Sequence, residues 1–384
     1  MHLKKLSLYA AAISLLTLSS TAVHAAGTKQ QLSGDAARCA ALASVDPGDN
    51  SQVTAELVPA AFPVPNAHPM MGASPNLKTK NAFCRVQVTA RPDQSEIHYE
   101  VWMPIASKWN GRFFGVGAGG FGGDILYASA PTFALGGLSG AMDAGYAAMA
   151  SDYGHRSSMM DLTWAAGNPQ QVADFGYRAV HVSTKGAKLL TAKFYGRKPN
   201  YSYWNGCSRG GAMAMVNAQR WYTDYDGIVA GNPARDWVRS LTSSTAYTLR
   251  QVRDPLARIP RSKLPFIHKA VLDQCDALDG VKDGIVSRAG QCRVDVRKLT
   301  CSAADSDQCL TAGQADALAE IYTGIRKRNG DRLADPYMPG AEANLPFLGM
   351  TSFAPSGTPS SPTSVAQFWS SFVYENPSYD PGAS

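Results

Sequence analysis

Charged residues are scarce in this chain, and they form no cluster of one sign. Only 17% of the 384 residues are Asp, Glu, Lys or Arg, and the formal net charge is +6. No run of lysines and arginines is dense enough for a nucleic-acid patch, which needs a concentrated basic face. We therefore expect no nucleic-acid partner. With 45% hydrophobic residues, a chain of this length can build a large core together with a substantial insertion.

The leading apolar run is too short to cross a membrane. Lys4 and Lys5 precede the apolar residues 6–18, and small residues follow as far as Ala25. This order is typical of a cleavable signal peptide. We therefore expect residues 1–25 to be a signal peptide and the mature protein to be secreted or periplasmic, with no membrane segment after cleavage. A retained membrane anchor is the alternative.

Cysteine is present in an odd number, which leaves one residue without a partner. Exported proteins normally pair their cysteines. Pairing the seven by proximity along the chain predicts Cys39–Cys84, Cys275–Cys292 and Cys301–Cys309, although spacing alone does not fix the connectivity. Cys207 is then left over, as a free thiol or with its partner missing. No other feature indicates an oligomeric state.

Cys207 directly precedes a serine in a Gly-x-Ser-x-Gly frame, from Gly206 to Gly210. Tyr201, Tyr203 and Trp204 predict a short strand, and residues 212–220 predict a helix, so Ser208 falls on the turn between them. This is the context of a nucleophile elbow, in which glycines allow a sharp turn without a Cβ clash and helix N-terminal amides can stabilise an oxyanion. A glycine-rich connection with an idle serine is the alternative.

A second glycine-rich loop, residues 117–123, follows the strand predicted over residues 112–116. In an α/β-hydrolase, the loop after this early strand supplies the second oxyanion N–H. A phosphate-cradling or merely flexible loop is the alternative, but the sequence lacks a Walker lysine and an acid at dinucleotide-binding spacing.

Strands alternate with helices as far as residue 235. Strands are predicted over residues 97–103, 146–151 and 227–231, and a helix of about five turns over residues 175–194. This alternation is typical of a parallel sheet covered on both faces. The fold class is therefore α/β, with an α/β-hydrolase core over residues 26–235. From residue 236 to residue 384 strands and helices no longer alternate, as expected for an inserted lid or, alternatively, a separate C-terminal domain.

The region after residue 236 contains an acidic cluster, with Asp276, Asp279 and Asp283 interrupted by glycines. Carboxylates and backbone carbonyls are the hard oxygen ligands that Ca²⁺ prefers, although the spacing is not that of an EF-hand. Asp-Gly pairs are also ordinary turn formers. Calcium binding and a simple turn both remain open on spacing alone.

Taken together, these residues resemble the tannase and feruloyl esterase family, which includes mono(hydroxyethyl) terephthalate hydrolases. The resemblance runs from about Cys39 to the end of the chain. Its most specific parts are residues 174–181, 194–197, the Gly-Cys-Ser-x-Gly-Gly elbow, residues 218–220 and 225–231.

The resemblance implies a serine carboxylic ester hydrolase that cleaves aromatic, phenolic acid esters. Ser208 would be the nucleophile, and the N–H groups of Arg209 and Gly120 would form the oxyanion hole. The acidic cluster would be a structural calcium site in a large lid, with ligands from five residues: the side chains of Asp276, Asp279 and Asp283 and the carbonyls of Val281 and Ile285.

Histidine is nearly absent where the family carries its catalytic base. Family members place the triad acid and base late in the chain, with a cysteine after the histidine that bonds the cysteine before the serine. Here only His268 follows Ser208, without an adjacent cysteine, and Cys207 has no such partner. His155, after a predicted strand, is expected to make structural hydrogen bonds. We therefore expect a C-terminally truncated chain that lacks core strands, completes only part of the lid, folds poorly and is inactive.

Three functional readings remain. The first is a fragment of a secreted carboxylic ester hydrolase. The second is a non-catalytic exported protein that binds aromatic or sugar ligands. The third is an obligate partner whose missing strands come from another chain.

Overall fold

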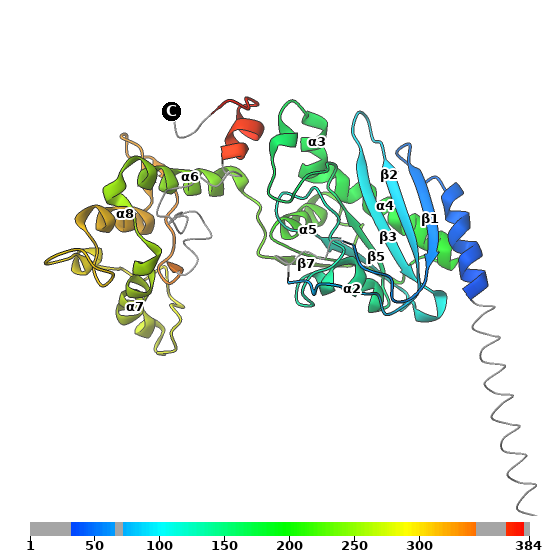
Figure 1. Ribbon diagram of the computed structural model, residues 1–384, viewed down its shortest axis with the longest axis horizontal. Coiled ribbons are helices and arrows are strands. Elements are labelled where there is room, and N and C mark those ends of the chain that lie inside the picture. Colours follow the sequence, from blue (N-terminus) through cyan, green and yellow to red (C-terminus); the bar gives the residue numbers. More distant parts are fainter. Residues whose placement is uncertain (1–31, 66–71, 343–365, 380–384) are drawn as a thin grey trace, which may run out of the picture. The chain divides into compact units, whose positions relative to one another are not determined.

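The chain forms two compact units (Figure 1). The computed structural model describes residues 32–65, 72–342 and 366–379. The first unit extends to Trp164 and resumes over Asn168–Arg235, and the second comprises Ala165–Gly167 and the described residues from Asp236 onward. The expected signal peptide and His68 lie outside the described residues. Among the helices that are described, none combines the length and apolar character needed to cross a bilayer.

A seven-stranded sheet forms the centre of the first unit, in the order β1-β2-β3-β5-β4-β6-β7. Its strands are β1 (Gln52–Val58), β2 (Phe83–Ala90), β3 (Ile97–Pro104), β4 (Arg112–Gly117), β5 (Ala147–Ser151), β6 (Tyr201–Cys207) and β7 (Gly227–Gly231). Neighbouring strands from β1 through β3 to β5 run antiparallel, whereas β5, β4, β6 and β7 run parallel. The prediction of a parallel sheet was thus right for one half and wrong for the other.

The described part of the first unit has five α-helices. They are a helix over residues 32–41, α2 (Gly137–Asp143), α3 (Pro169–Ala173), α4 (Ala179–Tyr195) and α5 (Arg209–Arg220). Of these, α2, α4 and α5 pack on this sheet. Tyr99 in β3 points to the face covered by α4, where it contacts Gly186. Its neighbour Glu100 points to the other face, where it meets Tyr127. The helix expected over residues 175–194 is divided, because a π-helical segment, Asp174–Arg178, precedes α4.

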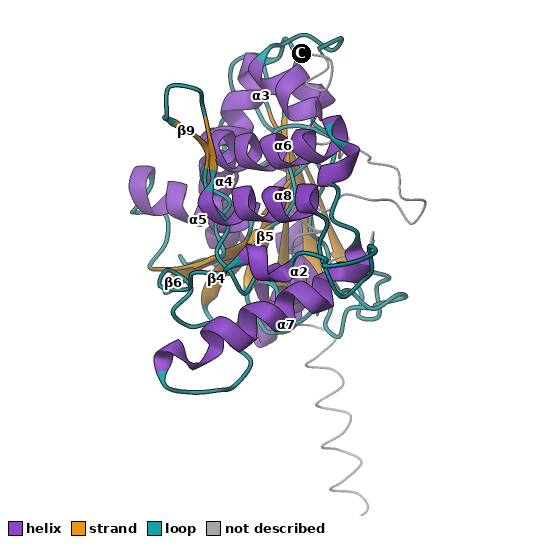
Figure 2. Ribbon diagram, turned by 90° about the vertical axis from the view of Figure 1, so that its left-hand side faces the viewer, coloured by secondary structure: helices purple, strands orange, loops and turns teal. Residues whose placement is uncertain are grey.

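The second unit is mainly helical (Figure 2). It contains α6 (Trp237–Arg253), α7 (Leu264–Cys275), α8 (Ala312–Thr323) and a short hairpin of β8 (Ile325–Arg326) with β9 (Arg332–Ala334). A continuous apolar core includes Tyr247, Ile267 and Leu318. The side chain of Thr311 caps α8 by accepting the N–H of Gln314, whose own side chain accepts the N–H of Thr311.

Three disulfides join Cys39–Cys84, Cys275–Cys292 and Cys301–Cys309. The first links the N-terminal helix to β2, and the other two lie in the second unit. These are the pairs expected from proximity along the chain. Cys207 is a free cysteine and is half-buried.

Candidate active site

Ser208 occupies the turn between β6 and α5. Its backbone has φ 57° and ψ −114°, a conformation that L-residues rarely adopt. The turn is pinned on both sides, because the Ser208 N–H donates to the carbonyl of Gly231 and the Ser208 carbonyl accepts from Ala212 and Ala234, each at 3.0 Å. A strained residue that its surroundings hold in this way is a common feature of functional sites. Ser208 therefore has the backbone of a nucleophile elbow.

The glycines around Ser208 are needed for close approach rather than for the turn itself. A Cβ on Gly206 would lie 2.5 Å from the carbonyl carbon of Gly210, and one on Gly210 would lie 2.5 Å from the backbone of Gly117. Neither Gly206 nor Gly210 has a positive φ, whereas Ser208 does. As expected, glycine avoids a Cβ clash at both positions, and the structure adds that β4, β6 and α5 meet there backbone to backbone.

The glycine loop after β4 is held by its own backbone amides. Ala118 N–H donates to the Tyr153 hydroxyl at 2.9 Å, Phe121 N–H to the carbonyl of Met159 at 2.7 Å, and Gly123 N–H to the carbonyl of Asp152 at 3.0 Å. These bonds fix both ends of the loop.

Two groups of amides near the elbow stay available for a ligand. The N–H groups of Gly119 and Gly120, in the middle of the loop, make no hydrogen bond within the described part of the chain. Arg209 is the first residue of α5, so its N–H has no intrahelical acceptor. These are the donors that an oxyanion hole requires.

The Arg209 side chain is a buried cation that pairs with no carboxylate of the described residues. It is only 4% exposed, and burial lowers its pKa to about 10, so it remains charged at neutral pH. Its Nη2 donates to the carbonyl of Phe175, and the guanidinium carbon lies 3.7 Å from the centroid of the Phe175 ring. Sequence reasoning assigned a role only to the Arg209 backbone, because nothing in the motif indicates where the side chain points.

His155 packs as an apolar ring. It is 2% exposed and stacks on Trp164 with centroids 3.7 Å apart. The backbones of Phe121 and Tyr153 approach the ring, but not in good hydrogen-bonding geometry, so the expected structural hydrogen bonds are weak. Burial, partly offset by the backbone of Phe121 and Tyr153, lowers the His155 pKa to about 4.

The other described histidines pair with carboxylates. His181 pairs with Asp224 at 2.7 Å. His98 contacts both Asp152 and Glu96 at 2.8 Å, and His268 contacts the buried Glu342 at 2.8 Å. The hydroxyl of Ser208 makes no hydrogen bond to any residue that the structure describes.

The acidic loop of the second unit turns its carboxylates onto its own backbone. Asp276 accepts from the N–H groups of Asp283 and Gly284, at 3.3 and 3.2 Å. Asp279 accepts from Val281 N–H at 3.0 Å, which is the main cause that lowers the Asp279 pKa. The oxygen atoms of the three carboxylates do not lie close enough together to form a preformed metal site. As oxygen ligands, however, they suit a hard cation.

Cys301, Asp305 and Cys309 do bring possible ligand atoms within 4.8 Å of one another. The two cysteines are joined as a disulfide, however, so neither offers a thiolate to a metal. This cluster is therefore structural.

Comparison with known proteins identifies the family. A model of the family described as tannase and feruloyl esterase matches residues 82–375. The chain belongs to the tannase and feruloyl esterase family. It is 41% identical over 264 residues to an uncharacterised esterase of Xanthomonas campestris pv. campestris, an alignment that covers 68% of this chain and 44% of that protein. It is also 32% identical to a probable feruloyl esterase B-1 of Aspergillus oryzae, covering 78% of this chain and 53% of that protein.

Solved structures of this family have the same fold. Feruloyl esterase B from Aspergillus oryzae matches with a TM-score of 0.75 and 29% identity, covering 91% of this chain and 67% of that one. A tannin acyl hydrolase from Aspergillus niger matches at a TM-score of 0.63 and 21% identity, which supports the fold alone. The resemblance inferred from the motifs and the α/β-hydrolase fold class are thereby confirmed. The chain spans about half the length of the first curated relatives it matches.

Proposed function

We propose that the protein is a secreted serine carboxylic ester hydrolase of the tannase and feruloyl esterase type, acting on aromatic acid esters. The observation that carries the proposal is the strained backbone of Ser208 between β6 and α5, in a chain of this family. The names of the family and of its relatives, tannase and feruloyl esterase, support a phenolic acyl group.

The proposed chemistry is acyl transfer in two halves. Ser208 Oγ attacks the ester carbonyl, and the N–H groups of Arg209 and Gly120 receive the developing oxyanion. The alcohol then leaves with a proton, and an acyl-enzyme remains on Ser208. Water attacks that acyl group, the acid leaves, and the proton returns to Ser208. The buried Arg209 guanidinium adds positive charge next to this site.

In this proposal Ser208 is the nucleophile and the N–H groups of Arg209 and Gly120 are the oxyanion donors, but no described residue is placed as a base on Ser208. Without a base, a serine hydroxyl keeps a pKa far above neutrality and attacks poorly. Binding and an oxyanion hole alone give about 10³–10⁴-fold over water. We therefore propose that the 384-residue chain by itself turns esters over far more slowly than a complete triad enzyme.

Calcium in the second unit is a further part of the proposal. The side chains of Asp276, Asp279 and Asp283, with the carbonyls of Val281 and Ile285, would hold the ion, which would stiffen this loop. The Asp side chains would have to turn from the backbone amides to do so. By resemblance to the family, we assign the second unit as the lid.

Export is proposed from the leader together with the disulfides. Three disulfides fit an oxidising compartment. The proposal places residues 1–25 as the cleaved signal peptide and the mature protein in the periplasm or outside the cell.

A non-catalytic binding protein is the second candidate, because Ser208 has no base among the described residues. Calorimetry with methyl ferulate, combined with chromatography of the released acid, separates the two. Slow acid release by the 384-residue chain, reduced in Ser208→Ala, supports the hydrolase. Saturable binding with the same background release in both proteins supports the binder.

A further inference from the structure

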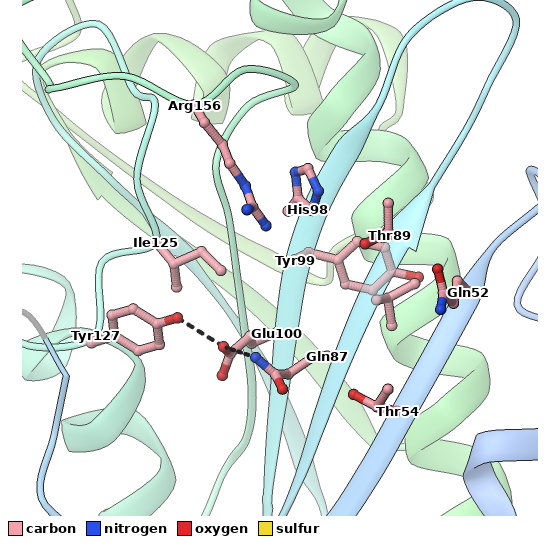
Figure 3. A pocket seen from close by; sticks show the side chains of 11 residues that line it. Gln52, Thr54, Gln87, Thr89, His98, Tyr99, Glu100, Ile125, Tyr127 and Arg156 are labelled. Atoms are coloured by element: carbon pink, nitrogen blue, oxygen red, sulfur yellow. Dashed lines mark hydrogen bonds between the residues drawn. The ribbon is translucent and has the colours of Figure 1, made fainter.

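A polar pocket lies on the antiparallel side of the first unit, away from the strand that carries Ser208. Its volume is about 290 Å³. Strands β1, β2 and β3 form its floor, and the segment with Ile125 and Tyr127 forms one wall (Figure 3). The Arg156 side chain reaches over the floor from the loop after β5. In the sheet, β5 and β4 separate this floor from β6.

Two rows of polar side chains cross the floor. Thr54 pairs with Gln87, which pairs with Glu100, and in the next row Gln52 pairs with Thr89. Residues paired across strands share a face, with Cβ atoms about 5 Å apart. The floor therefore presents amides and hydroxyls at a spacing comparable to the width of one sugar ring.

Glu100 lies at the bottom of the pocket, and its carboxylate oxygens already accept hydrogen bonds from neighbouring side chains. Although only 2% exposed, its carboxylate accepts from Arg85, Gln87, Trp102 and Tyr127, at 2.7 to 3.0 Å. Arg85 pairs with it through two nitrogens and neutralises its charge. The floor thus offers no free carboxylate for a cation. The same network fixes Gln87 and Tyr127 in place.

The pocket offers a ligand uncharged hydrogen-bonding groups on its floor and a cationic side chain above it. Among the described residues, the side chains of Gln52, Thr54 and Thr89 have no hydrogen-bond partner, and the amide oxygen of Gln87 is also unused. Arg156 has no carboxylate partner. Amides and hydroxyls suit ligand hydroxyls, whereas a guanidinium suits a carboxylate that it can bind through two nitrogens.

We propose that this pocket binds a sugar acid, a single uronate ring whose hydroxyls lie on the Thr54–Gln87 row and whose carboxylate pairs with Arg156. The volume lies just below the range of about 300–1,000 Å³ typical of drug-sized ligands, which favours one ring over a chain of rings. The inference is independent of the proposed ester hydrolysis, because no residue of the elbow lines the pocket.

Calorimetric titration of the 384-residue chain with D-glucuronate, D-glucose and acetate tests the proposal. Glucuronate should bind at least about tenfold more tightly than either glucose or acetate, because it alone fills both halves of the site. Arg156→Gln should reduce glucuronate binding to the level of glucose. Thr54→Val, which keeps the shape of an exposed side chain, should weaken both sugars. Arg328→Gln, an exposed arginine of the second unit, is the matched control and should change nothing.

The proposal fails if glucuronate shows no saturable binding at about 10 mM, a limit that corresponds to very weak affinity. It also fails if acetate binds as well as glucuronate, which would indicate an adventitious anion contact, or if Arg156→Gln leaves the preference over glucose unchanged. Thermal denaturation of each variant checks that it is folded. If Arg156→Gln does not fold, the sugar binding of Thr54→Val decides the outcome.

Discussion

Gly210 and Gly117 pack so closely that a Cβ on Gly210 would lie 2.5 Å from the carbonyl of Gly117. This contact joins the first turn of α5 to the end of β4, and so places the Ser208 turn against the start of the glycine loop. The proposed oxyanion site depends on this close contact, because one group of its N–H donors lies in the glycine loop and the other at the start of α5.

Gly210→Ala should therefore destabilise the first unit. The added methyl has backbone atoms on its far side and no room to move, and overpacking of this kind costs about 1–3 kcal/mol. Denaturant unfolding measures the change. Gly176→Ala is the matched control, because a Cβ there meets nothing within 4 Å and its φ is not positive. Equal stability of the two variants would contradict the account of the elbow glycines.

Tyr153→Phe should cost about 1–3 kcal/mol, because the buried N–H of Ala118 loses its acceptor. Tyr99→Phe is the control: Tyr99 is as deeply buried, but its hydroxyl makes no hydrogen bond to the described residues. We expect unfolding measurements to show a loss for the first variant and little change for the second. The reverse order would show that the Tyr153 hydroxyl does not hold the glycine loop.

His155 should make the protein sensitive to acid. Its pKa is about 4 in the folded state, against about 6.5 in an unfolded chain. Between these values the unfolded chain binds more protons, so the stability from neutral His155 is complete above pH 6.5 and is lost as the pH falls to 4. The expected loss is about 3 kcal/mol.

His155→Phe should remove this loss while keeping the stack on Trp164. Because neither ring nitrogen of His155 has a hydrogen bond of good geometry to a described residue, the variant should be at least as stable as the parent at pH 7.5. Melting temperatures measured from pH 7.5 to pH 4 compare the two proteins. If the melting temperatures of the parent and the variant fall in parallel, the protonation of His155 does not cause the loss of stability in acid.

Calcium should stabilise the second unit if the acidic loop binds it. At a free concentration one hundred times the dissociation constant, binding adds about 2.7 kcal/mol to the free energy of unfolding. Asp276→Asn should abolish the effect. Asp273→Asn, which changes an exposed carboxylate one turn earlier on α7, should not. An equal calcium response in both variants would place the ion elsewhere.

The elbow could be predicted from sequence because all its signals are local. The apolar strand, the glycine frame and the following helix lie within twenty residues. That a Cβ would clash at these glycines could be predicted too, but the contact of Gly210 with Gly117 could not, since the two are distant in the chain and meet only in the folded sheet. The same applies to His155, whose unpaired nitrogens depend on how Trp164 packs.

In the antiparallel half of the sheet β3 was predicted, whereas β1 was missed because it is half exposed and polar on one face. Thr54 and Glu56 alternate with small or modestly buried residues, so the apolar signal is weak. In the second unit, the helix α8 did have a signal, since Thr311 and Gln314 form a capping box at its start. A search for caps rather than for strand-helix alternation would have found it.

Labelling with a fluorophosphonate, followed by peptide mass spectrometry, tests most directly whether Ser208 is the nucleophile. In the 384-residue chain we expect a slowly formed adduct on Ser208, and no adduct in Ser208→Ala. Labelling at the rate of a working esterase would contradict the absence of a base among the described residues. An adduct on another residue, or none on Ser208 after long incubation, would contradict the assignment of the nucleophile itself.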